Sequence, residues 1–211
     1  MHIDGHDVLI VIDVQNDFCP GGALAVADGD AVIGPIHRIA PLFTHVVLTQ
    51  DWHPPDHTSF ATAHPGKKPL ELGYGQQTLW PPHCIQGSKG AEFHPALHLS
   101  QAELVLRKGF NPRIDSYSAF FENDRATPTG LAGYLEERDL TRIFFAGLAY
   151  DYCVGYSALD ARRLGLPAFV LRDACRSIDL DGSAARIEAE FARAGVSVIE
   201  CASLFGSGIP T

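Results

Sequence analysis

The chain has 211 residues, of which 46% are hydrophobic, and this size and composition predict one globular domain with a substantial core. Its formal net charge of −9 argues against nucleic acid as the main partner, because phosphate contacts require basic patches. No apolar run approaches the length of a membrane span, and no basic region precedes an apolar stretch at the N-terminus, so we expect a cytoplasmic protein.

Short apolar runs alternate along the chain with segments of helical periodicity. The runs are rich in Val, Ile, Leu and Phe without strict alternation, which predicts strands buried on both faces of a parallel sheet. The predicted strands span residues 7–12, 45–49, 103–107, 142–146, 168–171 and 196–199, and the predicted helices span residues 30–42, 128–138, 154–164 and 182–194. This order predicts a three-layer α/β/α fold for a single domain of residues 1–211, with a six-stranded, mainly parallel, doubly wound sheet and right-handed crossovers.

Residues 51–95 break this rhythm, because they show little periodicity and contain many Pro, Gly and His residues. A loop of that length in a compact domain is usually functional. We therefore expect this segment to supply metal-binding and active-site residues.

The cysteines indicate the redox state of the chain. They are odd in number, widely spaced and form no CxxC pair: Cys19, Cys84, Cys153, Cys175 and Cys201. This pattern predicts free thiols in a reducing compartment.

Chemically reactive side chains follow the first four predicted strands in turn: Asp13, then Asp51 with His53, then Lys108, then Cys153. Ligands of open α/β sheets bind beyond the carboxyl ends of the strands. We therefore expect these side chains to converge on one edge of the sheet.

Cys153 is the candidate nucleophile. It lies near the start of the helix predicted at 154–164, where the helix dipole and free backbone N–H groups favour a thiolate and offer an oxyanion hole. Asp13 is the candidate general base, since burial raises its proton affinity, and Lys108 would stabilise both anionic forms. Each residue alone also has a plainer interpretation, in which Cys153 is packed, Asp13 caps a turn and Lys108 is a surface charge.

The proline-rich segment carries a candidate metal site. Asp51 and His53 form an Asp-x-His pair that can point to one side of an extended chain, and His83 supplies a third ligand from a distant part of the loop. Such a set leaves positions open for water or substrate. The histidines could instead cap turns. His57 is a further candidate of this region, whereas three other histidines without comparable spacing are expected to be ordinary surface or loop residues: His64, His94 and His98.

Together these segments make the chain resemble the nicotinamidases (pyrazinamidases), within the isochorismatase-like cysteine hydrolases. The matching segments are Asp13-Val-Gln-Asn-Asp-Phe18, Asp51-Trp-His53-Pro, Trp80-Pro-Pro-His83-Cys84, Lys108-Gly, Asp115-Ser-Tyr117-Ser-Ala-Phe120 and Gly147-Leu-Ala-Tyr-Asp-Tyr-Cys153-Val. The resemblance implies hydrolysis of nicotinamide to nicotinate and ammonia, and of pyrazinamide to pyrazinoate, through a cysteine thioester in NAD salvage.

The resemblance also implies roles for individual residues. The implied catalytic triad is Asp13, Lys108 and Cys153. The implied oxyanion hole uses the backbone N–H groups of Ala149 and Cys153, often with a cis peptide at Ala149–Tyr150. One divalent metal ion, zinc ahead of iron or manganese, is implied on Asp51, His53 and His83. The residues that match the ring pocket of the family are Phe18, Trp80 and Tyr117.

Two features depart from the family pattern or leave it incomplete. Tyr150 stands where the family usually has Thr, and a bulkier ring there could change the pocket wall or the surroundings of the cis peptide. The fourth metal ligand is open among His57, Ser59 and water.

Two alternative functions remain: another small-amide or carbamoyl hydrolase, and a metal-binding α/β domain without catalysis. The implied partner is a small-molecule substrate, and the oligomeric state is left open.

Overall fold

The computed structural model describes residues 1–73 and 77–205. A six-stranded sheet of order β3-β2-β1-β4-β5-β6 forms its centre, and every neighbouring pair is parallel. The strands are β1 (Asp7–Ile12), β2 (His45–Asp51), β3 (Leu104–Lys108), β4 (Arg142–Leu148), β5 (Ala168–Arg176) and β6 (Ser197–Ile199). The predicted α/β fold with six strands is confirmed.

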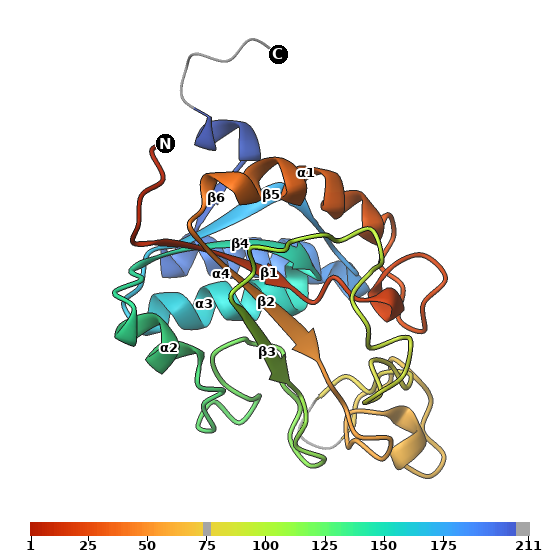
Figure 1. Ribbon diagram of the computed structural model, residues 1–211. Coiled ribbons are helices and arrows are strands. Elements are labelled where there is room, and N and C mark those ends of the chain that lie inside the picture. The colour runs from red at the N-terminus through yellow and green to blue at the C-terminus, as the bar shows by residue number, and fades with distance from the viewer. Residues whose placement is uncertain (74–76, 206–211) are drawn as a thin grey trace.

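The sheet separates two hydrophobic cores, because successive side chains of a strand point to opposite faces. Leu9 and Val11 pack on the face that carries α1 (Ile33–Ile39), whereas Val8, Ile10 and Ile12 pack on the opposite face. The helices on that opposite face are α2 (Leu131–Glu137), α3 (Gly155–Arg163) and α4 (Ser183–Ala194). Figure 1 shows the resulting three layers, with the sheet between α1 and the other helices.

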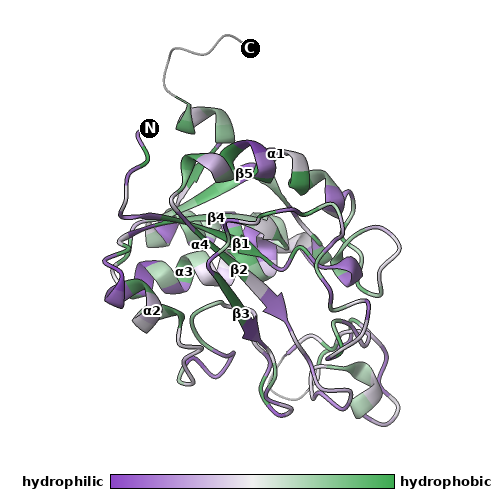
Figure 2. Cartoon of the chain, in the orientation of Figure 1, coloured by the Kyte–Doolittle hydropathy of each residue, from purple (hydrophilic) through white to green (hydrophobic). Residues whose placement is uncertain are grey.

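Burial follows the position of each strand in the sheet. Every residue of β1 is buried, as predicted for a strand covered on both faces. The same prediction is wrong for the edge strands, since Val105 of β3 and Val198 of β6 are exposed. Figure 2 shows apolar strands through the middle of the molecule and polar residues where β2 and β3 end.

Local contacts move several helix boundaries from their predicted positions. The helix predicted at 128–138 begins only at Leu131, because Pro128 pairs with Phe121 and the Thr129 hydroxyl accepts the Leu131 N–H at 3.2 Å. Short 3₁₀ turns at Gly29–Val32 and Ala40–Leu42 extend α1 to the predicted length. A π-helical turn, Tyr150–Val154, precedes α3.

The connection from β2 to β3 has little regular structure. Among its described residues, 52–73 and 77–103, the one helical turn is the 3₁₀ turn Ala61–Ala63. Figure 1 shows part of this connection beyond the arrowhead of β2, at the carboxyl edge of the sheet. Within the described part of the chain, no helix has the length and apolar character needed to cross a membrane.

Candidate active site and metal centre

The site lies at the switch point of the sheet, between β1 and β4. Successive strands are added on one side of β1 as far as β3, and on its other side from β4 onward. Asp13 follows β1, and Cys153 follows its neighbour β4, which leads into α3 on the other face from α1. Crevices at such switch points are the usual ligand sites of open α/β sheets. The predicted convergence of side chains therefore has a structural basis in the strand order.

Asp13 is fully buried and held by β2. Its backbone N–H donates to the Thr49 hydroxyl at 3.2 Å, and that hydroxyl donates to Asp13 Oδ1 at 2.6 Å. The other carboxylate oxygen, Oδ2, lies 2.8 Å from Lys108 Nζ. Burial raises the pKa of Asp13 although Lys108 opposes the rise, as predicted for a general base.

Lys108, the last residue of β3, connects the two predicted clusters. Besides Asp13, its ammonium lies 2.5 Å from Asp51 Oδ1, 2.9 Å from the Ser116 carbonyl oxygen and 3.4 Å from Cys153 Sγ. Its side chain is fully buried, so the interpretation as a surface charge is wrong. Burial alone would lower the pKa of Lys108, but Asp13 and Asp51 hold it well above its usual range. The contacts with Asp51 and Ser116 were not predicted.

Cys153 lies inside the π-helical turn rather than before a helix, and it is buried. Burial, together with the charges of Asp13 and Asp51, raises the pKa of the thiol well above its usual range, although Lys108 opposes this effect. This direction runs against the predicted preference for a thiolate, because burial excludes water and two carboxylates repel the negative charge. The thiol needs a base to remove its proton.

Ala149 precedes this π-helical turn and lines the same pocket as Cys153. A non-proline cis peptide bond is present, but it joins Leu148 to Ala149. The resemblance placed it one bond later, at Ala149–Tyr150, so that prediction is corrected. The N–H of Ala149 belongs to this cis bond.

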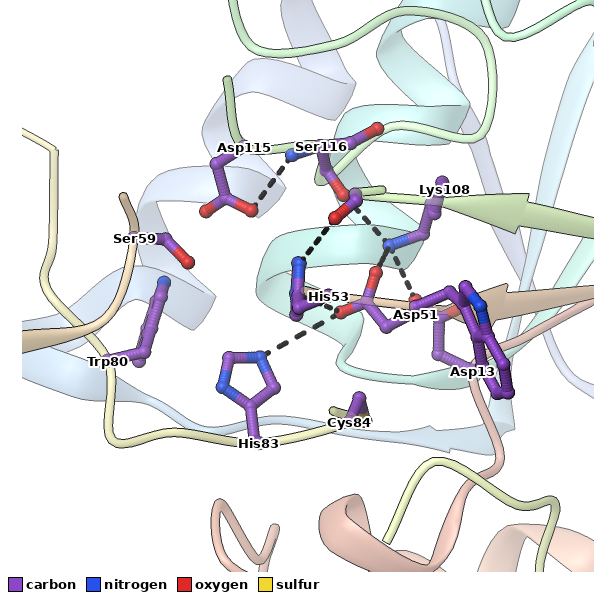
Figure 3. Close-up of polar contacts among 12 residues, drawn as sticks. Asp13, Asp51, His53, Ser59, Trp80, His83, Cys84, Lys108, Asp115 and Ser116 are labelled. Atoms are coloured by element: carbon purple, nitrogen blue, oxygen red, sulfur yellow. Dashed lines mark hydrogen bonds and ion pairs between the residues drawn. The ribbon is translucent and has the colours of Figure 1, made fainter. Parts of the chain in front are cut away.

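Asp51, His53 and His83 form a buried group whose ligand atoms all lie within 4.8 Å of one another. Asp51 Oδ2 is 3.4 Å from His53 Nε2 and 3.9 Å from His83 Nε2. The Nδ1 atom of each imidazole faces a backbone oxygen, that of Gly109 at 2.7 Å and that of Pro81 at 2.8 Å. Figure 3 shows both rings turned toward Asp51, with Lys108 on the other side of that carboxylate.

This donor set fits a divalent metal ion. A carbonyl that accepts from Nδ1–H fixes the tautomer in which Nε2 is free to bind, the usual arrangement around metal-bound imidazoles. Burial and the neighbouring His53 lower the pKa of His83 to about 4, so the ring is neutral, as a ligand must be. Two imidazoles and one carboxylate form a common three-residue set in catalytic metal sites.

Gly109 is required for the position of His53. A Cβ at this position would lie 2.4 Å from His53 Cε1, and its φ of +66° is in the left-handed region. Lys108 and Gly109 therefore contact different clusters. Lys108 binds the carboxylates of Asp13 and Asp51, and Gly109 contacts the metal-ligand candidate His53.

His57 lies beside His53 with ring centroids 4.3 Å apart. Its Nδ1 is 2.7 Å from the Ser59 hydroxyl, and its Nε2 is 3.3 Å from the Ile114 carbonyl oxygen. Each ring nitrogen of His57 therefore lies within hydrogen-bond distance of a protein oxygen. His57, His53 and Asp115 form a second buried group of ligand atoms, which shares His53 with the group that contains Asp51.

One pocket joins the two clusters to aromatic side chains. Asp51, His83, Ala149 and Cys153 line it together with the predicted Phe18, Trp80 and Tyr117, and with the unpredicted Leu24, Asp115, Tyr152 and Ile178. The Trp80 indole N–H donates to the Tyr117 hydroxyl at 3.0 Å, which fixes two of the pocket walls. The position of Tyr152 immediately before Cys153 could have identified it from the sequence.

Tyr150 does not line this pocket. Its hydroxyl lies 3.3 Å from Glu188 of α4, its ring packs edge-on against Phe191, and the Arg172 guanidinium covers it at 4.5 Å. The concern that a ring at this position changes the pocket wall is therefore not supported, because the side chain points into the core beneath α4.

Comparison with known proteins gives consistent matches. A family model of the isochorismatase domain matches residues 7–202. The nicotinamidase of Acinetobacter baylyi is 52% identical over 194 residues, which cover 90% of this chain and 91% of that protein. The solved structure of a nicotinamidase/pyrazinamidase from Acinetobacter baumanii is 51% identical with a TM-score of 0.94, covering 96% of this chain and 99% of that one.

A more distant solved structure includes a metal. The pyrazinamidase of Pyrococcus horikoshii in complex with zinc is 32% identical with a TM-score of 0.75, covering 92% of this chain and 99% of that one.

Proposed function

The chain belongs to the isochorismatase domain family, and we propose that it is a nicotinamidase that hydrolyses nicotinamide to nicotinate and ammonia in NAD salvage. The observation that carries this function is a pocket that joins a thiol, two of the three metal-ligand candidates and aromatic walls. A pyridine carboxamide matches those three features, with its amide at the thiol and its ring among the aromatic side chains. Pyrazinamide has the same shape and should be hydrolysed to pyrazinoate.

Nucleophilic attack begins with transfer of the Cys153 Sγ proton to the Asp13 carboxylate. Lys108 lies 2.8 Å from Asp13 and 3.4 Å from Cys153, so it orients both groups and stabilises the thiolate as it forms. The sulfur then bonds to the amide carbon, and the carbonyl oxygen gains negative charge. We assign the oxyanion hole to the N–H groups of Ala149 and Cys153, and one such donor contributes about 3–4 kcal/mol in the transition state.

Collapse of the tetrahedral intermediate breaks the C–N bond. Protonated Asp13 gives its proton to the nitrogen, which leaves as ammonia and leaves a thioester on Cys153. Asp13, again ionised, takes a proton from a water that attacks the thioester carbon. The acid formed loses its proton to solvent as nicotinate, and the proton on Asp13 returns to the thiol, so each turnover consumes one water.

The divalent metal ion is held in this proposal by Asp51, His53 and His83, and we assign it as zinc. The nitrogen and oxygen donors fit zinc, and also iron or manganese, and the resemblance to the zinc complex of a pyrazinamidase favours zinc. The bound metal supplies a Lewis acid for the pyridine nitrogen and thereby orients the ring. Phe18, Trp80 and Tyr117 hold the ring faces and edges in the same pocket.

Ammonia release by the purified zinc-loaded protein tests this function. We expect hydrolysis of nicotinamide and pyrazinamide, with little hydrolysis of maleamate or N-carbamoyl substrates, which lack a pyridine-type nitrogen. Cys153→Ala should reduce turnover by roughly 10⁴-fold or more, because no other group forms the thioester. Near-normal turnover in that variant would falsify the mechanism, and a preference for the carbamoyl substrates would overturn the substrate assignment.

The cellular location is the cytoplasm in this proposal. All five cysteines are free, which supports a compartment that keeps thiols reduced.

A further inference from the structure

Gln15 makes contacts that the proposed chemistry does not use. It lies two residues after Asp13 in the segment that follows β1, and its side chain is fully buried. The side-chain Nε2 donates to the Asp51 carbonyl oxygen at 2.8 Å, and Oε1 accepts the Asp51 backbone N–H at 2.8 Å. Nε2 also donates to the Ala91 carbonyl oxygen at 2.9 Å. One amide therefore binds both main-chain polar groups of a metal-ligand candidate.

The strand register explains why Asp51 needs this support. The β1–β2 pairing ends at Val11↔Leu48, whereas the β2–β3 pairing continues to Asp51↔Lys108. At Asp51, β2 therefore has a strand neighbour on only one side. The amide of Gln15 takes the place of a strand on the other side, because it offers a donor and an acceptor as a peptide group does.

Thr49 makes the reciprocal contact. Whereas Gln15, beyond β1, binds the backbone of Asp51 on β2, the hydroxyl of Thr49 on β2 binds the backbone N–H and the carboxylate of Asp13 beyond β1. Each side chain thus supports one of the two carboxylates that face Lys108. The two supports act on different carboxylates.

We propose that Gln15 is the positioning residue of the metal site, fixing the backbone of Asp51, whereas Thr49 positions the proton acceptor Asp13. The assignment of a metal to Asp51, His53 and His83 rests on the proposed function. Gln15 acts only through Asp51 and touches neither substrate nor metal. Without it, the buried N–H and C=O of Asp51 would have no partner on that side, so its carboxylate would lose its fixed position between Lys108 and the two imidazoles.

Gln50 provides a matched control. It precedes Asp51, is buried, and its Nε2 donates to the same Ala91 carbonyl oxygen at 2.8 Å, but its Oε1 accepts from Arg107 Nε at 3.1 Å instead of from Asp51. Gln15→Met and Gln50→Met therefore remove amides of the same type that share one acceptor. Only the first removes the contacts with Asp51.

The experiment measures the zinc dissociation constant of each metal-stripped protein by competition with a chromophoric chelator, together with turnover of the reloaded enzymes. We expect Gln15→Met to bind zinc about 10-fold or more weakly and Gln50→Met to stay within about twofold of wild type. Thr49→Val should lower kcat by about 10-fold or more while its zinc affinity stays within about twofold, and Thr49→Ser should restore kcat.

Equal zinc affinities for Gln15→Met and Gln50→Met would overturn the proposal, as would a loss of zinc affinity in Thr49→Val as large as that in Gln15→Met. If Gln15→Met does not fold, Gln15→Asn and Gln50→Asn replace the pair, because the shorter amide cannot reach both groups of Asp51. The zinc titration needs no substrate. A wild-type protein that binds zinc but does not hydrolyse nicotinamide would refute the proposed function alone, whereas one that binds no zinc would overturn the positioning role.

Discussion

The two halves of the site are positioned by different means. Asp13, Lys108 and Cys153 stand at the ends of adjacent or nearby strands, so the sheet itself sets their separation. On the metal side only Asp51 belongs to a strand, whereas His53 and His83 lie in the long connection from β2 to β3. The Nδ1 atom of each ring faces one backbone oxygen, that of Gly109 or that of Pro81.

This difference separates the two functions in the molecule. In the proposed mechanism the sheet carries the groups that move protons and attack the amide, and the connection carries the two imidazoles that would help to hold the metal ion. Lys108 is the point of contact between them, because its ammonium binds Asp13 and Asp51 at once. Changes at Lys108 should affect both halves, and a change at Asp13 should affect only the catalytic half.

Lys108→Met should have the largest effect, since it removes the cation from both halves. Two buried carboxylates lose their partner, so we expect the free energy of unfolding to fall by about 3–5 kcal/mol and turnover to fall by roughly 10³-fold or more. Urea unfolding and ammonia release measure the two quantities. Lys67→Met is the control, because Lys67 pairs with Glu71 at an exposed 3.8 Å contact and should change neither quantity. Normal stability in Lys108→Met would contradict the inferred role of its ion pairs.

Asp13→Asn should affect the catalytic half alone. The amide cannot accept the thiol proton, so we expect turnover to fall by roughly 10²–10⁴-fold while zinc affinity stays within about twofold. Steady-state kinetics and zinc competition measure this separation. A parallel loss of zinc affinity would show that the two halves are not independent at this residue.

Removal of the metal should make the stability of the folded protein sensitive to acid. The pKa of His83 is about 4 in the folded protein and 6.5 is its ordinary value, so between these values the unfolded chain binds more protons. Stability of the metal-free protein should therefore fall as the pH decreases below about 6.5, by about 2 kcal/mol through His83 at pH 5 relative to pH 8. Urea unfolding of chelator-treated wild type and His83→Phe at both pH values measures it. The same pH dependence in both proteins would exclude His83 as its source.

Tyr150→Phe should have the smallest effect, because the residue lies outside both halves. The change removes only a hydroxyl contact with Glu188, so we expect kcat and KM for nicotinamide to stay within about twofold and the free energy of unfolding to fall by less than about 1 kcal/mol. Kinetic assays and urea unfolding check this. A tenfold change in KM would place Tyr150 in the pocket after all.

Most of the strands and the residues of the candidate triad were predictable because each depends on local sequence. The buried strands are continuous apolar runs, and β1 has its predicted bounds. Asp13, Lys108 and Cys153 could be expected together because parallel strands end at one edge. The exposure of Val105 on β3 could not be predicted, since it depends on which strands lie at the edges of the sheet.

The sequence by itself therefore determined the fold class, the reactive side chains and the resemblance that points to nicotinamide. Only the tertiary structure decided how those side chains affect one another. It placed Lys108 between both carboxylates, buried Cys153 where the pKa of its thiol is raised, and brought Gln15 against the backbone of Asp51. The physical reason is that proton affinity and ligand position depend on burial and on neighbours distant in the chain, which no local pattern of residues encodes.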